Sequence, residues 1–294
     1  MQIIRSRMTG MCSGVRRALQ MARAIEDASG TAIYGELAHN PDIQEEMRRR
    51  GFQILKEAER RKPFAALRVL ITAHGISDSE RARLRASGKT LIDATCPYVR
   101  WIHQTAQRLS ASGYFVVMLG KRDHVEVRGV VEDLPAHAVV ETMEDVASWS
   151  ARKLGVICQS TLEPQQVQQL LSAIRARNRR KEIRFISTTC RETCKRQQAL
   201  RELLGQVDAL VVIGGRNSSN TLALVQMAAS HRVPCLHIAA VDELPDLWPV
   251  HFERIGLAAG ASTPDETIDA VHQKLLQLSQ SPVSEFLSHA VSSN

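Results

Sequence analysis

The stretch KTLIDATCPYVRWIH, residues 89–103, joins a short apolar run to a helix-like segment through a single cysteine. Two other stretches repeat this order: MQIIRSRMTGMCSGVRRAL at residues 1–19 and IRFISTTCRETCKRQQAL at residues 183–200. Their cysteines, Cys12, Cys96 and Cys190, lie roughly 90 residues apart, which indicates one cysteine per internal repeat. Three thiolates brought together by such repeats can hold an iron–sulfur cluster with one iron left open, so the pattern predicts a reaction centre.

Short apolar runs alternate with helical patterns along the chain, as in parallel α/β layers. Phe115–Leu119 and Ala209–Ile213 are predicted strands, and Pro97–Ser112 and Pro164–Arg177 are predicted helices. We therefore predict an α/β fold of three pseudo-repeated units arranged around one shared axis. The predicted boundaries are 1–96, 97–188 and 189–282, followed by a polar C-terminal tail at 283–294 that we expect to be a strap or disordered.

Two further series of polar residues recur in the loops that follow strands. The second series is His39 in GELAHN, His124 in GKRDHVE and Ser218 in GGRNSSN, and the third is His74 in TAHG, Ser160 in CQST and Ser262 in AGAST. Ligands of α/β proteins bind beyond the carboxyl ends of strands, where helix N-termini offer free N–H groups. The run from Asn217 to Asn220 at such a start suits a phosphate. Taken singly, these residues could be helix caps or loop histidines; their recurrence in three registers favours a site.

Composition narrows the class of protein. The 294 residues are 44% hydrophobic and 23% charged, as in soluble globular proteins. No apolar run reaches the roughly 18–20 residues that span a bilayer, and the start lacks a signal-peptide pattern, so we expect a cytoplasmic protein. The net charge of +7 favours anionic partners, either a phosphorylated substrate or an acidic electron-donor protein. With only 4% aromatic residues, nucleic acid is the weakest candidate.

The other three cysteines, Cys158, Cys194 and Cys235, fall outside the first series. Six cysteines are too dilute for a disulfide scaffold of this length. Cys158 and Cys235 lie in apolar strand runs and are predicted core residues. Cys194 lies one helical turn after Cys190 and is an alternative or fourth ligand. A zinc site of three cysteines and one histidine in a binding module is a further alternative.

At this point the motifs resemble a known family. GMCSGVRRA, GELAHN, TAHGIS, DATCPYV, GKRDHVEVRG, CQSTL, GGRNSSNT and AGASTPD are similar, in order from Met1 to about Leu278, to the motif set of the 4-hydroxy-3-methylbut-2-enyl diphosphate reductase (LytB/IspH) family. The resemblance implies a trefoil of three α/β domains around a [4Fe-4S] cluster with three cysteine ligands and one open iron. It also implies an oxidoreductase that removes a hydroxyl from an allylic diphosphate. The products would be isopentenyl and dimethylallyl diphosphate, in the last step of the methylerythritol phosphate pathway of isoprene biosynthesis.

The resemblance also implies roles for individual residues. Cys12, Cys96 and Cys190 would be the metal ligands, and the diphosphate would be bound by His39, His74, Ser218, Ser219, Asn220 and Ser262. Glu126 would deliver protons, with His124 and Ser160 supporting this network at the substrate, and Thr193 would lie near the third ligand and the substrate. An enclosed site favours a neutral Glu126. Electrons would come from an external donor such as ferredoxin or flavodoxin, because the chain carries no flavin or nicotinamide fingerprint.

Several positions depart from the family pattern. The family usually has an aromatic residue at Met11, proline at Val125 and threonine at Ser160, and Glu192 and Lys195 add charge after the third ligand. Two alternatives therefore stay open. One is a paralogous [4Fe-4S] reductase that acts on a different allylic diphosphate. The other is a non-enzymatic sensor built on the cluster, which the intact Glu126 and the complete phosphate set disfavour.

Overall fold

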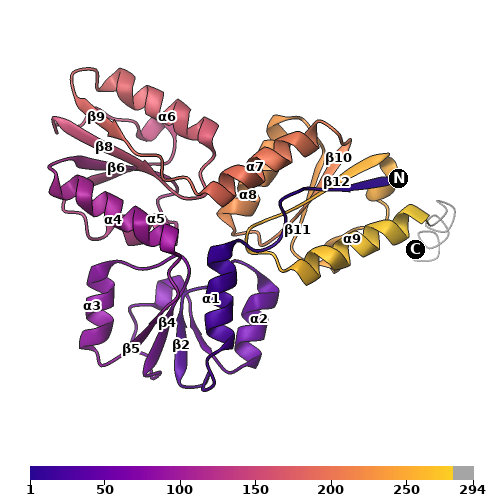
Figure 1. Ribbon diagram of the computed structural model, residues 1–294, viewed down its shortest axis with the longest axis horizontal. Coiled ribbons are helices and arrows are strands. Elements are labelled where there is room, and N and C mark those ends of the chain that lie inside the picture. Colours follow the sequence, from indigo (N-terminus) through magenta and orange to yellow (C-terminus); the bar gives the residue numbers. More distant parts are fainter. Residues whose placement is uncertain (281–294) are drawn as a thin grey trace. The chain divides into compact units, whose positions relative to one another are not determined.

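The computed structural model describes residues 1–280, so the predicted tail at 283–294 lies outside the described residues. It contains three four-stranded sheets, and every strand pair in them is parallel (Figure 1). The predicted α/β fold with three sheets is therefore confirmed. Among helices in this range, none has both the length and the apolar character needed to cross a membrane.

The N-terminal sheet has the strand order β3-β2-β4-β5. Its elements are β2 (Thr31–Tyr34), β3 (Gln53–Leu55), β4 (Arg68–Ile71), β5 (Thr90–Asp93), α1 (Ser13–Arg23), α2 (Pro41–Arg49), α3 (Asp78–Ala86) and the short 3-10 turn η1 (Glu57–Glu59). Helices α1 and α2 lie on one side of the sheet and α3 on the other (Figure 1). Leu84 of α3 packs on the apolar side chains of β2 and β4.

The middle sheet has the order β7-β6-β8-β9. Its elements are β6 (Phe115–Leu119), β7 (His137–Val140), β8 (Lys153–Cys158), β9 (Glu182–Phe185), α4 (Pro97–Ala111), α5 (Val125–Val131), α6 (Pro164–Arg177) and η2 (Met143–Asp145). Successive residues of β6 face opposite ways, as the period of two in a strand requires. Val116 and Met118 pack with α4 and α5, whereas Val117 and Leu119 pack with α6.

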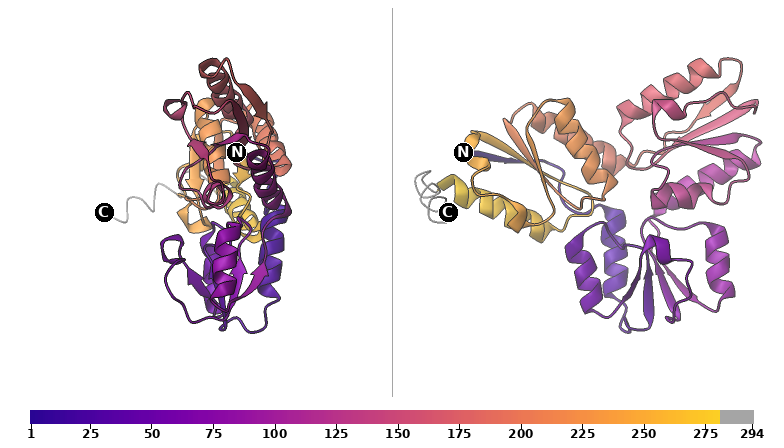
Figure 2. Two further views of the ribbon diagram at one scale, coloured as in Figure 1. Left: turned by 90° about the vertical axis from the view of Figure 1, so that its left-hand side faces the viewer. Right: turned by 180° about the vertical axis from the view of Figure 1, so that it is seen from behind.

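The C-terminal sheet has the order β1-β12-β10-β11. Its elements are β1 (Gln2–Arg5), β10 (Ala209–Ile213), β11 (Cys235–Ile238), β12 (Arg254–Ala259), α7 (Arg191–Leu204), α8 (Ser219–Ser230), α9 (Asp265–Gln280), η3 (Val241–Glu243) and η4 (Pro249–His251). Helices α7 and α8 share one apolar cluster with the sheet, and α9 belongs to the cluster on its other face. The view from behind shows this separation across the sheet (Figure 2).

The first strand, β1, belongs to the C-terminal sheet, although the predicted boundaries place residues 2–5 in the first repeat. The structure pairs β1 in parallel with β12, from Gln2 opposite Arg254 to Arg5 opposite Leu257. The apolar Ile3 and Ile4 are covered there by the two clusters of the C-terminal sheet. The repeat boundaries at residues 96 and 188 remain predictions.

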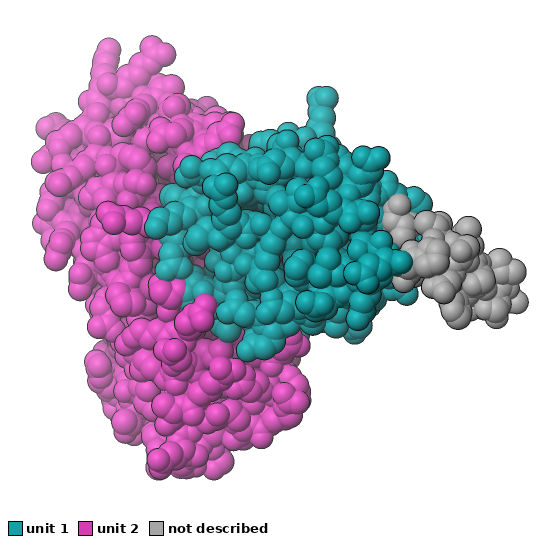
Figure 3. All heavy atoms as spheres, turned by 45° about the vertical axis from the view of Figure 1, so that its right-hand side comes forward, with its two compact units in different colours: residues 1–12, 39–41, 192–294 teal, residues 13–38, 42–191 magenta. Residues whose placement is uncertain are grey.

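Contacts divide the chain into two compact units, which Figure 3 colours separately. Unit 1 contains residues 1–12 and 39–41 together with the chain from Glu192 onward. Unit 2 contains residues 13–38 and 42–191, and therefore both the N-terminal and the middle sheets. Each unit is described by itself below.

Helices α4 and α5 pack closely around His103. A Cβ atom added to Gly129 of α5 would lie 3.5 Å from the His103 ring, and one added to Gly75 would lie 3.6 Å from His103 Nε2. Burial, together with the nearby positive charge of Arg81, lowers the pKa of His103 to about 4, and the carboxylates of Asp78, Asp133 and Asp93 only partly offset this effect. The imidazole is therefore neutral in the folded protein at neutral pH.

This environment makes stability depend on pH. Between the ordinary histidine pKa of 6.5 and the folded value of about 4, the unfolded chain binds a proton that the folded chain does not. The free energy of unfolding therefore falls as pH drops through this window. We expect His103→Gln to lose less stability between pH 7 and pH 5 than the wild type, measured by urea denaturation. His137→Gln, at an exposed site on β7, should behave like the wild type; equal losses in all three proteins would contradict the prediction.

Candidate functional site

Each cysteine of the first series stands directly before a helix. Cys12 precedes α1, Cys96 is the N-cap residue of α4, and Cys190 precedes α7. The main-chain N–H of each cysteine donates to a loop carbonyl: Cys12 to Ala261 at 2.9 Å, Cys96 to Ala73 at 3.0 Å and Cys190 to Ser160 at 2.9 Å. These acceptors are a residue of the third series or its immediate predecessor. The same kind of main-chain bond thus ties each cysteine of the first series to a loop of the third series.

The cysteine side chains suit a metal-binding role. All three are free thiols of intermediate exposure, as is Cys194 in α7. Cys12 belongs to unit 1, whereas Cys96 and Cys190 belong to unit 2. Within residues 1–280, no group of three or more histidine, cysteine, aspartate or glutamate side chains is already gathered around a metal position. The donor set itself, three reduced and accessible thiols at helix starts, is one that binds iron.

The other strand cysteines are structural. Cys158 is fully buried, and its sulfur lies 3.3 Å from the Thr189 hydroxyl. Burial raises the pKa of the Cys235 thiol to about 11, so it stays protonated and is a poor metal ligand. Cys158 therefore lies in the core as predicted, whereas Cys235 is only partly buried and packs against the apolar cluster of the C-terminal sheet.

Unit 1 brings together five of the predicted diphosphate residues. Ser218 caps α8 by accepting from the Thr221 N–H at 3.3 Å, and Ser219 and Asn220 form the first turn of that helix. Asn220 Oδ1 accepts from the Ala261 N–H at 2.9 Å, while its buried Nδ2 has no hydrogen-bond partner among the described residues. Ser262 donates to the His39 carbonyl at 3.3 Å. Free donors at a helix start form an anion site.

A glycine allows this cluster to close. A Cβ atom at Gly215 would lie 2.1 Å from the His39 carbonyl oxygen, so no other residue fits between β10 and His39 without a shift of the main chain. Sequence reasoning did not single out Gly215, although the Gly-Gly pair before Arg216 was a usable signal. Thr193, the other predicted substrate residue in unit 1, is buried in the first turn of α7.

Unit 2 brings together the predicted proton-transfer residues. Glu126 is 2% exposed, and its carboxylate accepts from the Ser160 N–H at 2.7 Å and from the Ser160 hydroxyl at 2.5 Å. Burial raises the pKa of Glu126, and the two bonds from Ser160 only partly counteract this. The predicted neutral Glu126 agrees with this direction.

Two of the predicted site histidines, His74 and His124, lie in unit 2, and His124 stands two residues before Glu126 in the chain. His124 Nδ1 accepts from the Glu126 N–H at 3.2 Å and so caps α5. In neutral His124 the ring proton is therefore on Nε2. The rings of His74 and His124 meet edge to face, with centroids 5.8 Å apart. Unlike the other predicted diphosphate residues, His74 thus lies in unit 2, where its ring meets that of His124.

The residues that depart from the family pattern still support the local structure around the site. Val125 is the first residue of α5, where proline is favoured because its N–H is not needed; the His124 cap defines the same helix start. Ser160 makes its hydroxyl bond to Glu126 without the methyl group of threonine. Lys195 is exposed on α7, so its charge is solvated.

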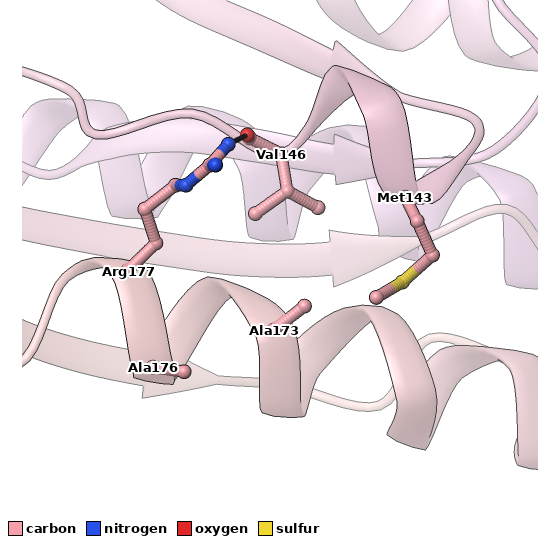
Figure 4. Close-up of a pocket in the computed structure, with 5 residues that line it drawn as sticks. All are labelled: Met143, Val146, Ala173, Ala176 and Arg177. Carbon is pink, nitrogen blue, oxygen red and sulfur yellow. Dashed lines mark hydrogen bonds between the residues drawn. The ribbon is translucent and has the colours of Figure 1, made fainter.

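The site does not coincide with the open apolar cavity of the middle sheet. This cavity, of about 360 Å³, lies between η2 and α6 and is lined by Met143, Val146, Ala173, Ala176 and Arg177. Figure 4 shows Arg177 bonded to the Val146 carbonyl, away from Met143. The lining of this cavity includes no residue of the three series.

Comparison with known proteins gives one consistent match. The family model described as LytB protein matches residues 3–276. The 4-hydroxy-3-methylbut-2-enyl diphosphate reductase of Aquifex aeolicus is 32% identical over 94% of this chain and 96% of that protein, and that of Geobacter sulfurreducens is 33% identical over 94% and 97%. A solved structure of the E-1-hydroxy-2-methyl-but-2-enyl-4-diphosphate reductase from Plasmodium falciparum aligns with a TM-score of 0.85, covering 96% of this chain and 89% of that one, at 24% identity. A structure of (E)-4-hydroxy-3-methyl-but-2-enyl diphosphate reductase, 31% identical, aligns with a TM-score of 0.66 over 94% of this chain and 100% of that one.

Proposed function

The chain belongs to the LytB protein family, and on this basis we propose that it is a 4-hydroxy-3-methylbut-2-enyl diphosphate reductase, the terminal enzyme of the non-mevalonate pathway. It is an iron–sulfur-dependent oxidoreductase with a small-molecule diphosphate substrate. The observation that carries the proposal to these residues is the buried Glu126 carboxyl group held by Ser160, because a binding module or a sensor has no use for it.

The reaction requires two electrons and two protons: the C–O bond to the hydroxyl breaks, a C–H bond forms and water leaves. Glu126 is suited to supply a proton to the departing oxygen, since its raised pKa favours the protonated form and Ser160 fixes its direction. His124, which caps the helix that carries Glu126, supports this proton-transfer network.

The diphosphate is assigned to the unit 1 cluster of His39, Ser218, Ser219, Asn220 and Ser262. His74, a residue of unit 2, stays a predicted diphosphate residue. The unpaired amide nitrogen of Asn220 and the start of α8 offer neutral donors, which can bind phosphate oxygens without a metal ion. These groups orient the substrate and leave the allylic end free to react. Thr193 is assigned to the substrate as well.

Cys12, Cys96 and Cys190 are the residues that would hold a [4Fe-4S] cluster, since they are the three free thiols that recur at helix starts. When bound, such a cluster supplies electrons one at a time and a Lewis-acidic iron. The reducing equivalents come from an external donor of the ferredoxin or flavodoxin type, and the net charge of +7 favours an acidic protein.

An anaerobic turnover assay tests this function. Reconstituted protein is given 4-hydroxy-3-methylbut-2-enyl diphosphate and a strong one-electron reductant, and the products are identified. Isopentenyl and dimethylallyl diphosphate are the expected products. A brown, iron-loaded protein that leaves this substrate unchanged would instead identify a paralogue with another allylic diphosphate, marked by Val125, Ser160 and Glu192.

The role of Ser160 predicts a shift in the pH profile. Activity that needs protonated Glu126 is present below its pKa and falls as pH rises through it. The Ser160 hydroxyl holds that pKa down, so Ser160→Ala should raise it further and move the falling limb of kcat to higher pH. Ser160→Thr keeps the hydroxyl and should keep the wild-type limb. A limb that stays in place or moves to lower pH in Ser160→Ala contradicts the assignment.

A further inference from the structure

A buried arginine anchors the loop that carries the first cysteine. Arg196, on α7, is only 2% exposed. Its Nη1 donates to the carbonyls of Met8 at 3.1 Å and Ala259 at 2.9 Å, and its Nη2 donates to the Gly10 carbonyl at 2.8 Å. All three acceptors are main-chain oxygens of unit 1. Burial lowers the pKa of Arg196, and the charges of Cys12, Glu192 and Asp265 only partly offset this effect. Its direct hydrogen bonds go to main-chain carbonyls, so the guanidinium holds the path of the chain.

The acceptors show what this arginine controls. Met8 and Gly10 belong to the loop from Met8 to Cys12, and Ala259 is the last residue of β12. Arg196 thus clamps the loop onto the end of the strand beside which β1 lies. The same loop is fixed at its far end by the Cys12 N–H bond to Ala261.

The loop requires such support because its backbone is unusual. Gly10 has φ +82°, and a Cβ atom there would lie 2.2 Å from Asp265 Oδ1. A segment in this conformation makes few regular main-chain bonds, so its carbonyls need other donors. A guanidinium presents N–H groups on separate nitrogens of a rigid planar fork, so it reaches carbonyls that lie further apart than those within reach of the single nitrogen of a lysine ammonium.

We propose that Arg196 is a positioning residue that sets the path of the loop from Met8 to Cys12 and thereby aims the Cys12 thiol at the cluster. The part that concerns the cluster rests on the proposed function; the part that concerns the loop does not. The residue acts through the main chain and has no contact with substrate in this assignment.

Hydrogen–deuterium exchange on the full-length apo protein tests the loop directly. In Arg196→Met, the amides from Met8 to Cys12 should exchange about tenfold faster or more, while amides of β10 in the same unit keep their wild-type rates. Arg196→Lys should show an intermediate change. Arg254→Met removes an exposed arginine that pairs with Asp208 at 2.7 Å, and should leave the loop unchanged.

Iron and sulfide retention after reconstitution gives the second readout. Arg196→Met should lose its cluster to a chelator about 10–100-fold faster than the wild type, as for loss of other supporting partners of metal ligands. Unchanged loop exchange, or equally faster exchange in the loop and β10, overturns the proposal. Selective loop exchange with normal cluster retention overturns its cluster part. If Arg196→Met does not fold, Arg196→Lys provides the test. Wild-type exchange rates from Met8 to Cys12 in Arg196→Lys would show that the guanidinium is not required, and would overturn the proposal. Absence of turnover in the wild type would refute the proposed function and leave the exchange result valid.

Discussion

The variants Cys12→Ser, Cys96→Ser and Cys190→Ser are each expected to fold and to lose the iron–sulfur cluster, and with it all measurable turnover. The serine hydroxyl stays protonated near neutral pH and is a harder donor than a thiolate, so it binds iron poorly. The loss in cluster affinity should exceed the roughly 10–100-fold that follows removal of an outer partner of a ligand. Iron and sulfide content, the visible absorption spectrum and anaerobic turnover measure the effect.

Cys235→Ser is the matched control. Cys235 lies on β11 in unit 1, and its thiol is kept protonated by burial, so this variant should retain full iron content and activity. Cys194→Ser addresses the remaining free thiol of α7 in the same assay. A full iron content in Cys190→Ser, together with loss of iron in Cys194→Ser, would move the third ligand from Cys190 to Cys194. A full iron content in Cys12→Ser or Cys96→Ser would contradict the role of that cysteine as a ligand.

Glu126→Gln is expected to keep the cluster and the affinity for the diphosphate, while kcat falls by about 10²–10⁴-fold. Glutamine has nearly the same shape, and its Oε1 can still accept from the Ser160 N–H, with the Ser160 hydroxyl turned to accept from Nε2. It does not donate a proton to a leaving oxygen. Single-turnover kinetics on the reduced, reconstituted protein would measure the loss, and substrate titration would measure binding.

The matched control for this variant lies at the end of the same helix. Glu132, the C-cap residue of α5, bonds to Arg61 and to the Ser77 hydroxyl, and its side chain is 36% exposed. Glu132→Gln should retain turnover within a factor of about two, because it changes a surface ion pair of small energy. Near-normal turnover in Glu126→Gln would remove Glu126 from the mechanism.

Strands and helices with strong periodicity could be predicted from the sequence. Pro164–Arg177 and Phe115–Leu119 occur with the predicted bounds, since proline marks the helix start and the strand is a continuous apolar run. The predicted helix from Pro97 to Ser112 ends one residue earlier, at Ala111, and Ser112 is its C-cap residue. The candidate site could be predicted because cysteine, histidine and serine residues recur at three loop positions in each of three series.

Features that depend on tertiary contacts could not be predicted in this way. Helix α5 has the sequence VEVRGVV, whose β-branched residues and central glycine are poor helix formers; the His124 cap and packing on α4 make it helical. Helix α3 was missed although Ser77 and Glu80 form an N-terminal capping signal. A buried charge such as Arg196 looks like any surface arginine in the sequence, and only the carbonyls around it reveal its place.

The pairing of β1 with β12 sets an order in which the sheets can fold during synthesis. The strands of the N-terminal and middle sheets are complete in the nascent chain by Phe185, whereas β1 must wait for the whole remaining chain before its partner exists. Contacts so distant in sequence form slowly, and an unpaired strand edge is prone to wrong pairing while it waits. Cys12 reaches its bonded position next to Ala261 only after this closure. Cluster binding through Cys12 is therefore expected to follow synthesis of β12, and a bulky group fused next to β1 is expected to disturb the pairing of β1 with β12.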